Sequence, residues 1–169
     1  MLKPELVDAG ILPPLDPANS LTRIGVGTSK KALGSVSAPA LRKVATRLRL
    51  ELANAQDQLK FSSDGTDAKS KQFRRARAWR AALYQPAGEP RCLGDQVLAL
   101  LAVSKGLLDD TATDDEESLR KITQDLVAHA RSTVPEMLDL ITESRDITPA
   151  ASTHLEKVTS DFLEGALAR

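Results

Sequence analysis

The sequence predicts an all-α protein, a bundle of about six helices preceded by an irregular N-terminal arm. Apolar residues recur at spacings of three and four from residue 37 onward, as they do along one face of a helix. The alternating pattern of a half-buried β-strand is absent throughout. With 169 residues, the chain can bury a core as one domain or as one domain with an arm.

The predicted arm covers residues 1–36. Pro4 to Ala9 can make a single helical turn, and proline and glycine favour a loop from there to Ser37. The same loop carries eight large aliphatic residues, too many for a solvated linker. They are Ile11, Leu12, Leu15, Leu21, Ile24, Val26, Leu33 and Val36. We therefore expect the arm to lie in a groove, of its own domain or of a neighbouring chain.

A basic helical hairpin is predicted over residues 37–85. Its first helix begins at Ser37, a good N-cap, with Pro39 in the first turn, and its narrow apolar stripe continues to about Phe61. Turn-forming residues separate it from a second helix at 69–84. If the two helices pack antiparallel, as the short connection favours, their cationic sides lie next to each other.

The helix at 69–84 is apolar on one side and cationic on the other. Its apolar side consists of Phe73, Ala76, Trp79 and Leu83, and its cationic side of Lys71, Arg74, Arg75 and Arg77, with Arg80 at the boundary. It contains no acidic residue, although surface helices usually mix charges of both signs. Two interpretations remain open: a surface for a polyanion or acidic partner, or an ordinary solvated face. We expect Phe73 and Trp79 to belong to the core.

An acidic helical bundle is predicted over residues 91–169, packed on the hairpin as one globular unit. A helix that starts near Asp95 is apolar on every side, so we expect it to be the central, buried helix. Another helix follows the acidic stretch 109–117. Residues 133–136 have the pattern of a capping box, where a new helix or a kink begins, and Pro149 opens the last helix.

Charge is divided unevenly along a chain whose formal net charge is zero. Residues 1–91 hold 16 Lys and Arg and 8 Asp and Glu, whereas residues 92–169 hold 7 and 15. Such asymmetry points to charged partners. The halves can neutralise each other within one chain, or they can meet on neighbouring copies in a head-to-tail contact.

No motif for catalysis, cofactor binding or metal binding is present. Gly25 and Gly27 precede Lys30, but a phosphate-binding loop needs its lysine directly after a glycine. The two histidines fall on different helices and Cys92 is alone, so neither a metal site nor a nucleophile with its base is indicated. We therefore expect a non-catalytic protein that needs no cofactor or metal.

Cysteine content and hydropathy indicate a compartment. A single cysteine excludes an intrachain disulfide and favours a reducing environment. No apolar run approaches the ~18 residues of a membrane span, and the N-terminus lacks the pattern of a signal peptide. We expect a cytoplasmic protein that makes no membrane contact.

Nine cations of the predicted hairpin are the candidate nucleic-acid contacts. They are Arg42, Lys43, Arg47, Arg49, Lys71, Arg74, Arg75, Arg77 and Arg80. Lysine and arginine neutralise backbone phosphates, whereas no helix-turn-helix or exposed aromatic platform is present to recognise bases. The sequence therefore predicts binding to DNA or RNA without sequence preference.

In its build, the chain from residue 37 to 169 resembles the small helical subunit of CRISPR surveillance complexes, an antiviral defence family. The resemblance lies in the basic helices, the acidic end and the lack of an active site. It implies a non-catalytic subunit that stacks in several copies along the crRNA-bearing backbone, beside other protein subunits. It assigns backbone contacts to Arg42, Arg47, Lys71, Arg74, Arg75 and Arg77. The alternative is a structural assembly or connector protein, such as a phage particle component, whose arm and charge asymmetry serve protein contacts only.

Overall fold

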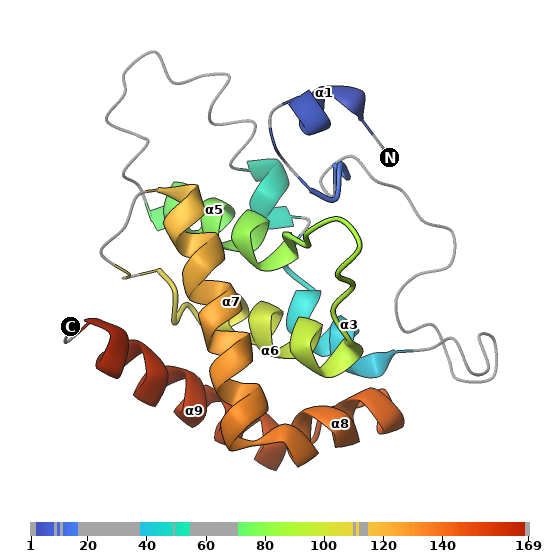
Figure 1. Cartoon of the computed structure of the whole chain (residues 1–169), viewed down its shortest axis with the longest axis vertical. Helices are drawn as coiled ribbons and strands as arrows, with labels where there is room; N and C mark the ends of the chain where they lie inside the picture. Colours follow the sequence, from blue (N-terminus) through green and yellow to red (C-terminus); the bar gives the residue numbers. More distant parts are fainter. Residues whose placement is uncertain are drawn as a thin grey trace.

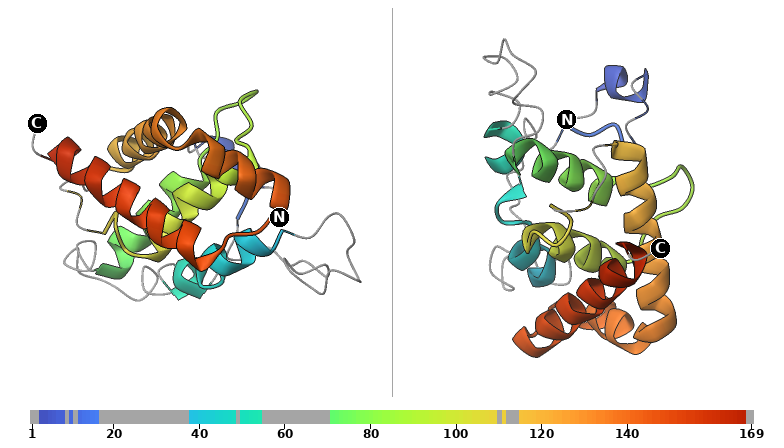
Figure 2. Two further views of the ribbon diagram at one scale, coloured as in Figure 1. Left: turned by 90° about the horizontal axis from the view of Figure 1, so that it is seen from below. Right: turned by 90° about the vertical axis from the view of Figure 1, so that its left-hand side faces the viewer.

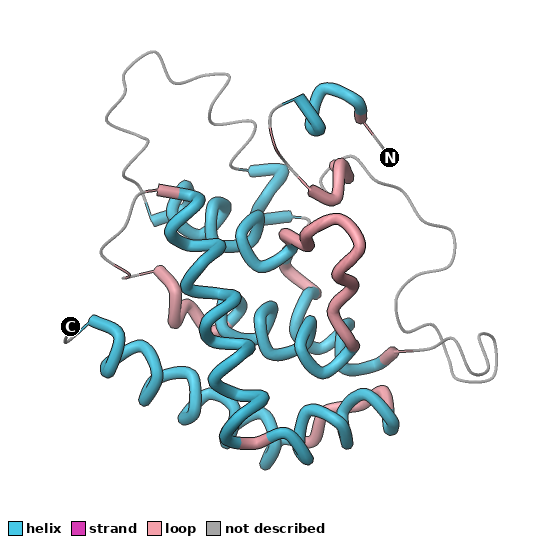
Figure 3. The backbone as a smooth tube through the Cα atoms, in the orientation of Figure 1, coloured by secondary structure: helices cyan, strands magenta, loops and turns pink. Residues whose placement is uncertain are grey.

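The computed structural model describes residues 3–8, 10, 12–16, 38–48, 50–54, 71–109, 111 and 115–167. Within these residues seven helices pack into a bundle and no β-strand occurs (Figure 3). The helices are α1 (Pro4–Asp8), α3 (Pro39–Ala45), α5 (Lys71–Leu83), α6 (Leu93–Ser104), α7 (Glu116–Thr133), α8 (Pro135–Ser144) and α9 (Pro149–Leu167). The all-α prediction is confirmed.

The centre of the bundle is α6, which packs against α3, α5, α7, α8 and α9 (Figure 1). Every residue from Val97 to Val103 is buried. A helix that is apolar on every side must be surrounded by other elements, and α6 meets this requirement. Its predicted central position is therefore confirmed. The N-cap is Cys92, and Asp95 lies in the first turn instead of capping it.

The first predicted helix is interrupted. α3 ends at Ala45, Thr46 and Arg47 form a turn, and helical structure resumes at Leu48 and continues over the described residues 50–54. The hydroxyl of Thr46 donates a hydrogen bond to the carbonyl of Arg42, four residues earlier. Such a side-chain bond competes with the backbone ladder and tends to bend a helix.

The helix starts agree with the predictions at two places and differ at a third. Pro39 and Pro149 open α3 and α9 as expected. The predicted capping box before α8 is wrong, because its N-cap is Val134, which makes no side-chain cap bond. The hydroxyl of Thr133 instead donates to the carbonyl of His129 at 2.9 Å, inside the preceding helix.

α5 is enclosed more completely than an amphipathic surface helix. Phe73 and Trp79 are buried, as expected. Ala78 and Ala81 are fully buried as well, although neither belongs to the predicted apolar side. The reason is that α5 packs against both α6 and α7. The cationic side of α5 is therefore narrower than its sequence indicates.

The described part of the N-terminal segment touches the bundle beyond the end of α5. The backbone N–H of Gln85 donates to the carbonyl of Leu12 at 3.2 Å, and Arg120 Nη1 donates to the carbonyl of Gly10 at 3.3 Å. The predicted N-cap Ser37 is wrong, because the N-cap of α3 is Ala38, which makes no side-chain cap bond. Most of the predicted arm and the turn between the two basic helices lie outside the described residues. The division into arm, hairpin and bundle therefore stays a prediction.

The last two helices occupy the end of the molecule opposite α1 (Figures 1 and 2). α7 runs along the bundle toward that end, where α8 and α9 follow. Each of these two helices packs against α6 and α7, and they make few contacts with each other. This arrangement leaves their outward sides without a partner in the described part of the chain.

Candidate functional site

The candidate cations are distributed over two helices that both rest on α6. α3 and the turn after it carry Arg42, Lys43 and Arg47, which are exposed, and α5 carries Arg74, Arg75, Arg77 and Arg80, which are half-buried. Arg49 and the side chain of Lys71 lie outside the described residues. None of the four described arginines on α5 is fully exposed to solvent.

Arg75 makes interactions inside the fold. Its Nε lies 3.3 Å from Asp109 Oδ1 and its Nη2 lies 3.2 Å from Asp109 Oδ2, so the contact is bidentate. The carboxylate is almost completely buried, with 3% of its side chain exposed. Arg75 Nη1 also lies 3.9 Å from Glu51 Oε1. This arginine therefore neutralises a buried acid of its own chain.

Lys43 has an internal partner as well. Its ammonium group donates to Asp146 Oδ1 at 2.7 Å and to the carbonyl of Ile147 at 2.8 Å. These bonds join α3 to the connection between α8 and α9. Nearby, the backbone N–H of Ala40 donates to the carbonyl of Arg145 at 3.1 Å. Lys43 thus holds two distant parts of the chain together.

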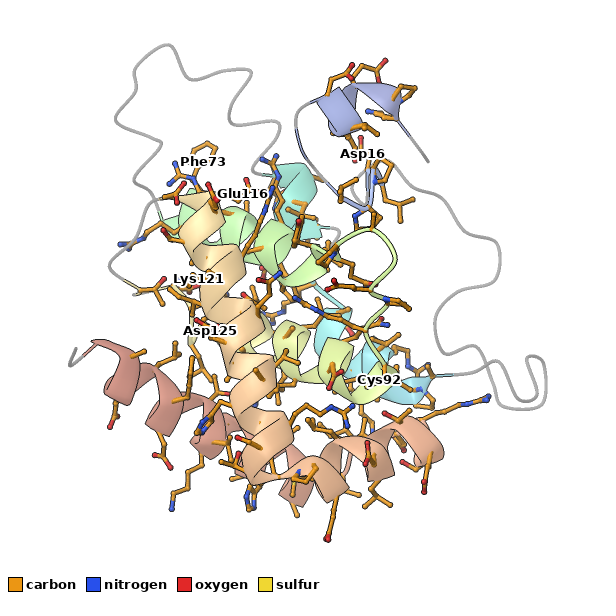
Figure 4. All side chains as sticks on the ribbon, in the orientation of Figure 1. Asp16, Phe73, Cys92, Glu116, Lys121 and Asp125 are labelled. Atoms are coloured by element: carbon orange, nitrogen blue, oxygen red, sulfur yellow. The ribbon has the colours of Figure 1, made fainter. Side chains whose placement is uncertain are left out.

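A polar cluster surrounds Cys92 at the start of α6 (Figure 4). Arg131 Nε donates to Asp95 Oδ1 at 2.7 Å, and Nη1 donates to Asp139 Oδ1 at 2.5 Å. Nη2 donates to the sulfur of Cys92, whose thiol donates to Asp95 Oδ2 at 2.9 Å. The bond to Asp95 raises the pKa of Arg131. Through these bonds the permanently charged guanidinium of Arg131 connects α6, α7 and α8.

A recess beside Tyr84 and the first turns of α7 has mixed charge. The guanidinium of Arg120 lies over the Tyr84 ring, 4.6 Å from its centroid, and bonds Glu116 at 2.7 Å. The walls include Lys121 and Asp125, which Figure 4 labels along α7. Because cations and acids alternate there, the recess favours no ligand of a single charge.

An apolar groove of about 580 Å³ lies between the starts of α8 and α9. Its lining consists of Val134, Pro135, Glu136, Met137, Leu140, Thr148, Ala150, Ala151 and His154. Leu140 is 61% exposed. The buried apolar residues of α8 are Leu138 and Ile141, and the exposed Leu140 was not identified from the sequence. The sequence could have revealed this exposed residue, because Leu140 lies outside the core-facing side of the helix and between acids at positions 136 and 143.

Two kinds of site are lacking in the described part of the chain. No three His, Cys, Asp or Glu side chains among the described residues come together as potential metal ligands. No helix there is both long and apolar enough to cross a bilayer. The described features include contacts within the fold, a recess of mixed charge beside Tyr84, a smaller recess beside Lys43 and Glu51, and an apolar groove at the α8–α9 end.

A helical bundle whose polar clusters tie its own elements together and whose apolar groove faces outward is typical of a protein-contact module. Residues 38–162 match the family described as "ATP synthase alpha/beta chain, C terminal domain". This range begins one residue before α3 and ends within α9. The chain belongs to that family.

Two curated relatives align with nearly the whole chain. ATP synthase subunit alpha of Desulfovibrio desulfuricans is 29% identical over 168 residues, which is 97% of this chain and 31% of the relative. ATP synthase subunit alpha 2 of Syntrophotalea carbinolica is 33% identical over 170 residues, covering 96% of this chain and 30% of the relative. The chain thus spans about a third of the length of these relatives.

Family membership corrects the predicted function. The resemblance to the CRISPR small subunit is wrong, and so are the nucleic-acid partner and the phage-connector alternative. The prediction of head-to-tail stacking along a polyanion depended on a nucleic-acid partner, so it loses its support as well. The misleading features were basic helices and an acidic end, which many helical domains share. On α5, moreover, packing half-buries the described arginines, and Arg75 pairs with acids of its own chain.

Proposed function

We propose that this chain acts as the C-terminal helical domain of an ATP synthase α-like subunit in an F1 ATPase assembly. The observation that carries the proposal is the family match from residue 38 to 162, which spans the helices from α3 to most of α9. Relatives named ATP synthase subunit alpha extend the similarity to 97% of the chain. In this role its partners are other ATP synthase subunits, and the domain faces the cytoplasm.

The domain supplies contacts in this role, and nucleotide chemistry belongs to the rest of such a subunit. The sequence has no phosphate-binding loop. Two described arginines, Arg75 and Arg131, pair with acids on other elements of the same chain. Guanidinium groups stay protonated and cannot serve as bases at neutral pH. These features support a non-catalytic helical module within a larger assembly.

Affinity purification of the tagged full-length protein from its own cells tests the proposal. ATP synthase subunits should co-purify in comparable amounts, as identified by mass spectrometry, and the protein alone should not hydrolyse ATP. A tagged cytoplasmic protein of similar size serves as the control. Recovery of the chain alone from cells with an intact ATP synthase, or ATP turnover by the isolated chain, would contradict the proposal.

A further inference from the structure

We infer that the groove between α8 and α9 is the docking site for an amphipathic, basic helix of another protein subunit. The inference deepens the proposed function and rests on it, because it names a surface and a partner chemistry for the assembly role.

The groove arises from the way the last two helices are anchored. α8 and α9 each pack against α6 and α7 but make few contacts with each other. Between them Arg145 adopts a left-handed conformation with φ of 58°, and Ile147 is buried. Lys43 further fixes this connection through Asp146. The diverging helices therefore belong to the packed fold, and the groove between them is part of its surface.

The floor and walls of the groove are mostly apolar. Met137 and Leu140 come from α8, and Ala150 and Ala151 come from α9. Leu140 exposes 61% of its surface. Small alanines opposite longer side chains leave room for an incoming side chain of leucine size. A groove of this kind, with an exposed leucine on its wall, has the form that receives the apolar side of a helix from another protein.

The charges beside the groove decide which helix fits. Glu136, Leu140 and Glu143 stand at positions i, i+4 and i+7, so the two acids flank the exposed leucine in one row along α8. Both acids are exposed. A helix that presents an apolar residue to Leu140 therefore places its flanking side chains beside two carboxylates. Lysine or arginine at those positions gives electrostatic complementarity.

The opposite wall fixes the orientation of the partner. α9 contributes His154, and the exposed Lys157 follows one turn later. The acidic edge is thus on α8 only, so the basic side of the partner helix must face α8 and not α9. Acidic helices and anionic lipid headgroups would meet Glu136 and Glu143 with charge of the same sign, and both are disfavoured.

Site-specific crosslinking in the purified assembly tests the inference. A photoreactive phenylalanine replaces Leu140 in the full-length chain, and a matched variant carries it at Leu50, which is exposed to 62% against 61% for Leu140. We expect crosslinks from position 140, several-fold above those from position 50, to a peptide of another subunit with apolar and Lys or Arg residues at helical spacing. A crosslink from 140 to an acidic segment, to lipid or to a second copy would overturn the inference, as would equal yields from both positions.

Charge reversal separates this inference from the proposed function. Glu136→Lys with Glu143→Lys should weaken association of the crosslinked subunit by about tenfold. The control pair Asp161→Lys with Glu164→Lys changes two exposed acids of α9 outside the groove and should leave association unchanged. If no ATP synthase subunit co-purifies with the unaltered chain, the proposed function fails. If co-purification is normal and both pairs of changes have no effect, only the groove inference fails.

Discussion

The indole N–H of Trp79 donates to Glu51 Oε2 at 2.6 Å, and Trp79 is fully buried. The bond joins α5 to the helical residues 50–54 that follow α3. A buried indole N–H needs an acceptor, because its hydrogen bond with water is lost when the protein folds. Glu51 supplies that acceptor while its second oxygen faces Arg75 at 3.9 Å. The acid therefore serves the fold, although it lies in the most basic part of the sequence.

Removing this acceptor should destabilise the protein. Glu51→Ala leaves the Trp79 N–H unpaired and should lower the free energy of unfolding by about 1–3 kcal/mol. Glu51→Gln keeps an oxygen acceptor and should cost less. Urea unfolding measures both values, and the fluorescence of Trp79, the only tryptophan in the chain, reports the local change. Equal midpoints for the alanine variant and the unaltered protein would show that the bond contributes nothing.

The buried carboxylate of Asp109 should depend on its arginine. Arg75→Met removes the bidentate partner of a side chain that is 3% exposed and should cost about 3 kcal/mol. Replacing both residues, with Arg75→Met and Asp109→Leu, also removes the buried charge and should restore much of the loss. A double-mutant cycle from urea midpoints gives the coupling energy. Arg47→Met changes an exposed cation in the turn after α3 and should stay within about 0.5 kcal/mol. If the effects of Arg75→Met and Asp109→Leu on the free energy of unfolding were strictly additive, the two residues would not be coupled and this account would be wrong.

How far the sequence predicts the fold depends on the element. For α6, apolar residues on every side leave one solution, a helix in the centre, and Val97 to Val103 are all buried. For α5, the pattern distinguishes an apolar side from a cationic one, but it does not show how many neighbours the helix has. Ala78 and Ala81 are buried because a second helix covers them, and alanine carries too weak a signal to predict that.

The candidate site was harder to predict for a related reason. Pairing partners such as Asp109 for Arg75 or Asp146 for Lys43 are distant in sequence, so charge counts cannot distinguish a cation paired inside the fold from one offered to a ligand. The exposure of Leu140 could have been predicted, because this apolar residue lies outside the buried side of its helix. Membership of the ATP synthase family follows from similarity over residues 38–162, and it was not identified from charge and periodicity.

Two glycines should respond to the same substitution in opposite directions. A Cβ at Gly94 would overlap the backbone carbonyl of Leu138, because α6 and α8 approach closely there. Gly94→Ala should therefore destabilise the protein by about 1–3 kcal/mol. Gly165 lies within α9, and an alanine methyl group there would have no neighbouring atom within 4 Å, so Gly165→Ala should stabilise the protein by up to about 1 kcal/mol. Thermal unfolding of the two variants measures the contrast, and a tolerated Gly94→Ala would show that the two helices can move apart at little cost.

The start of α7 should make stability depend on pH. Asp115 is the N-cap, and its carboxylate accepts hydrogen bonds from the backbone N–H and the hydroxyl of Ser118, both at 2.9 Å. The bond from the Ser118 backbone N–H is the main reason that the pKa of Asp115 lies below its ordinary value of 3.8. A carboxyl group whose pKa is lower in the folded state stabilises that state at pH values above 3.8, and this stabilisation is lost as the pH falls through the folded-state pKa.

Asp115→Asn tests this dependence, because asparagine still caps a helix but does not titrate near that pH. The unaltered protein should unfold at a higher temperature than the Asn variant at pH 7, and the difference should shrink as the pH falls below 3.8. Glu117→Gln is the control, since it removes a negative charge from the same helical turn and leaves the cap side chain in place. Carbon NMR of the Asp115 carboxyl group measures its pKa directly. A difference in unfolding temperature that stays constant with pH, or a carboxyl group that titrates at or above its ordinary value, would rule out the charged cap as the cause.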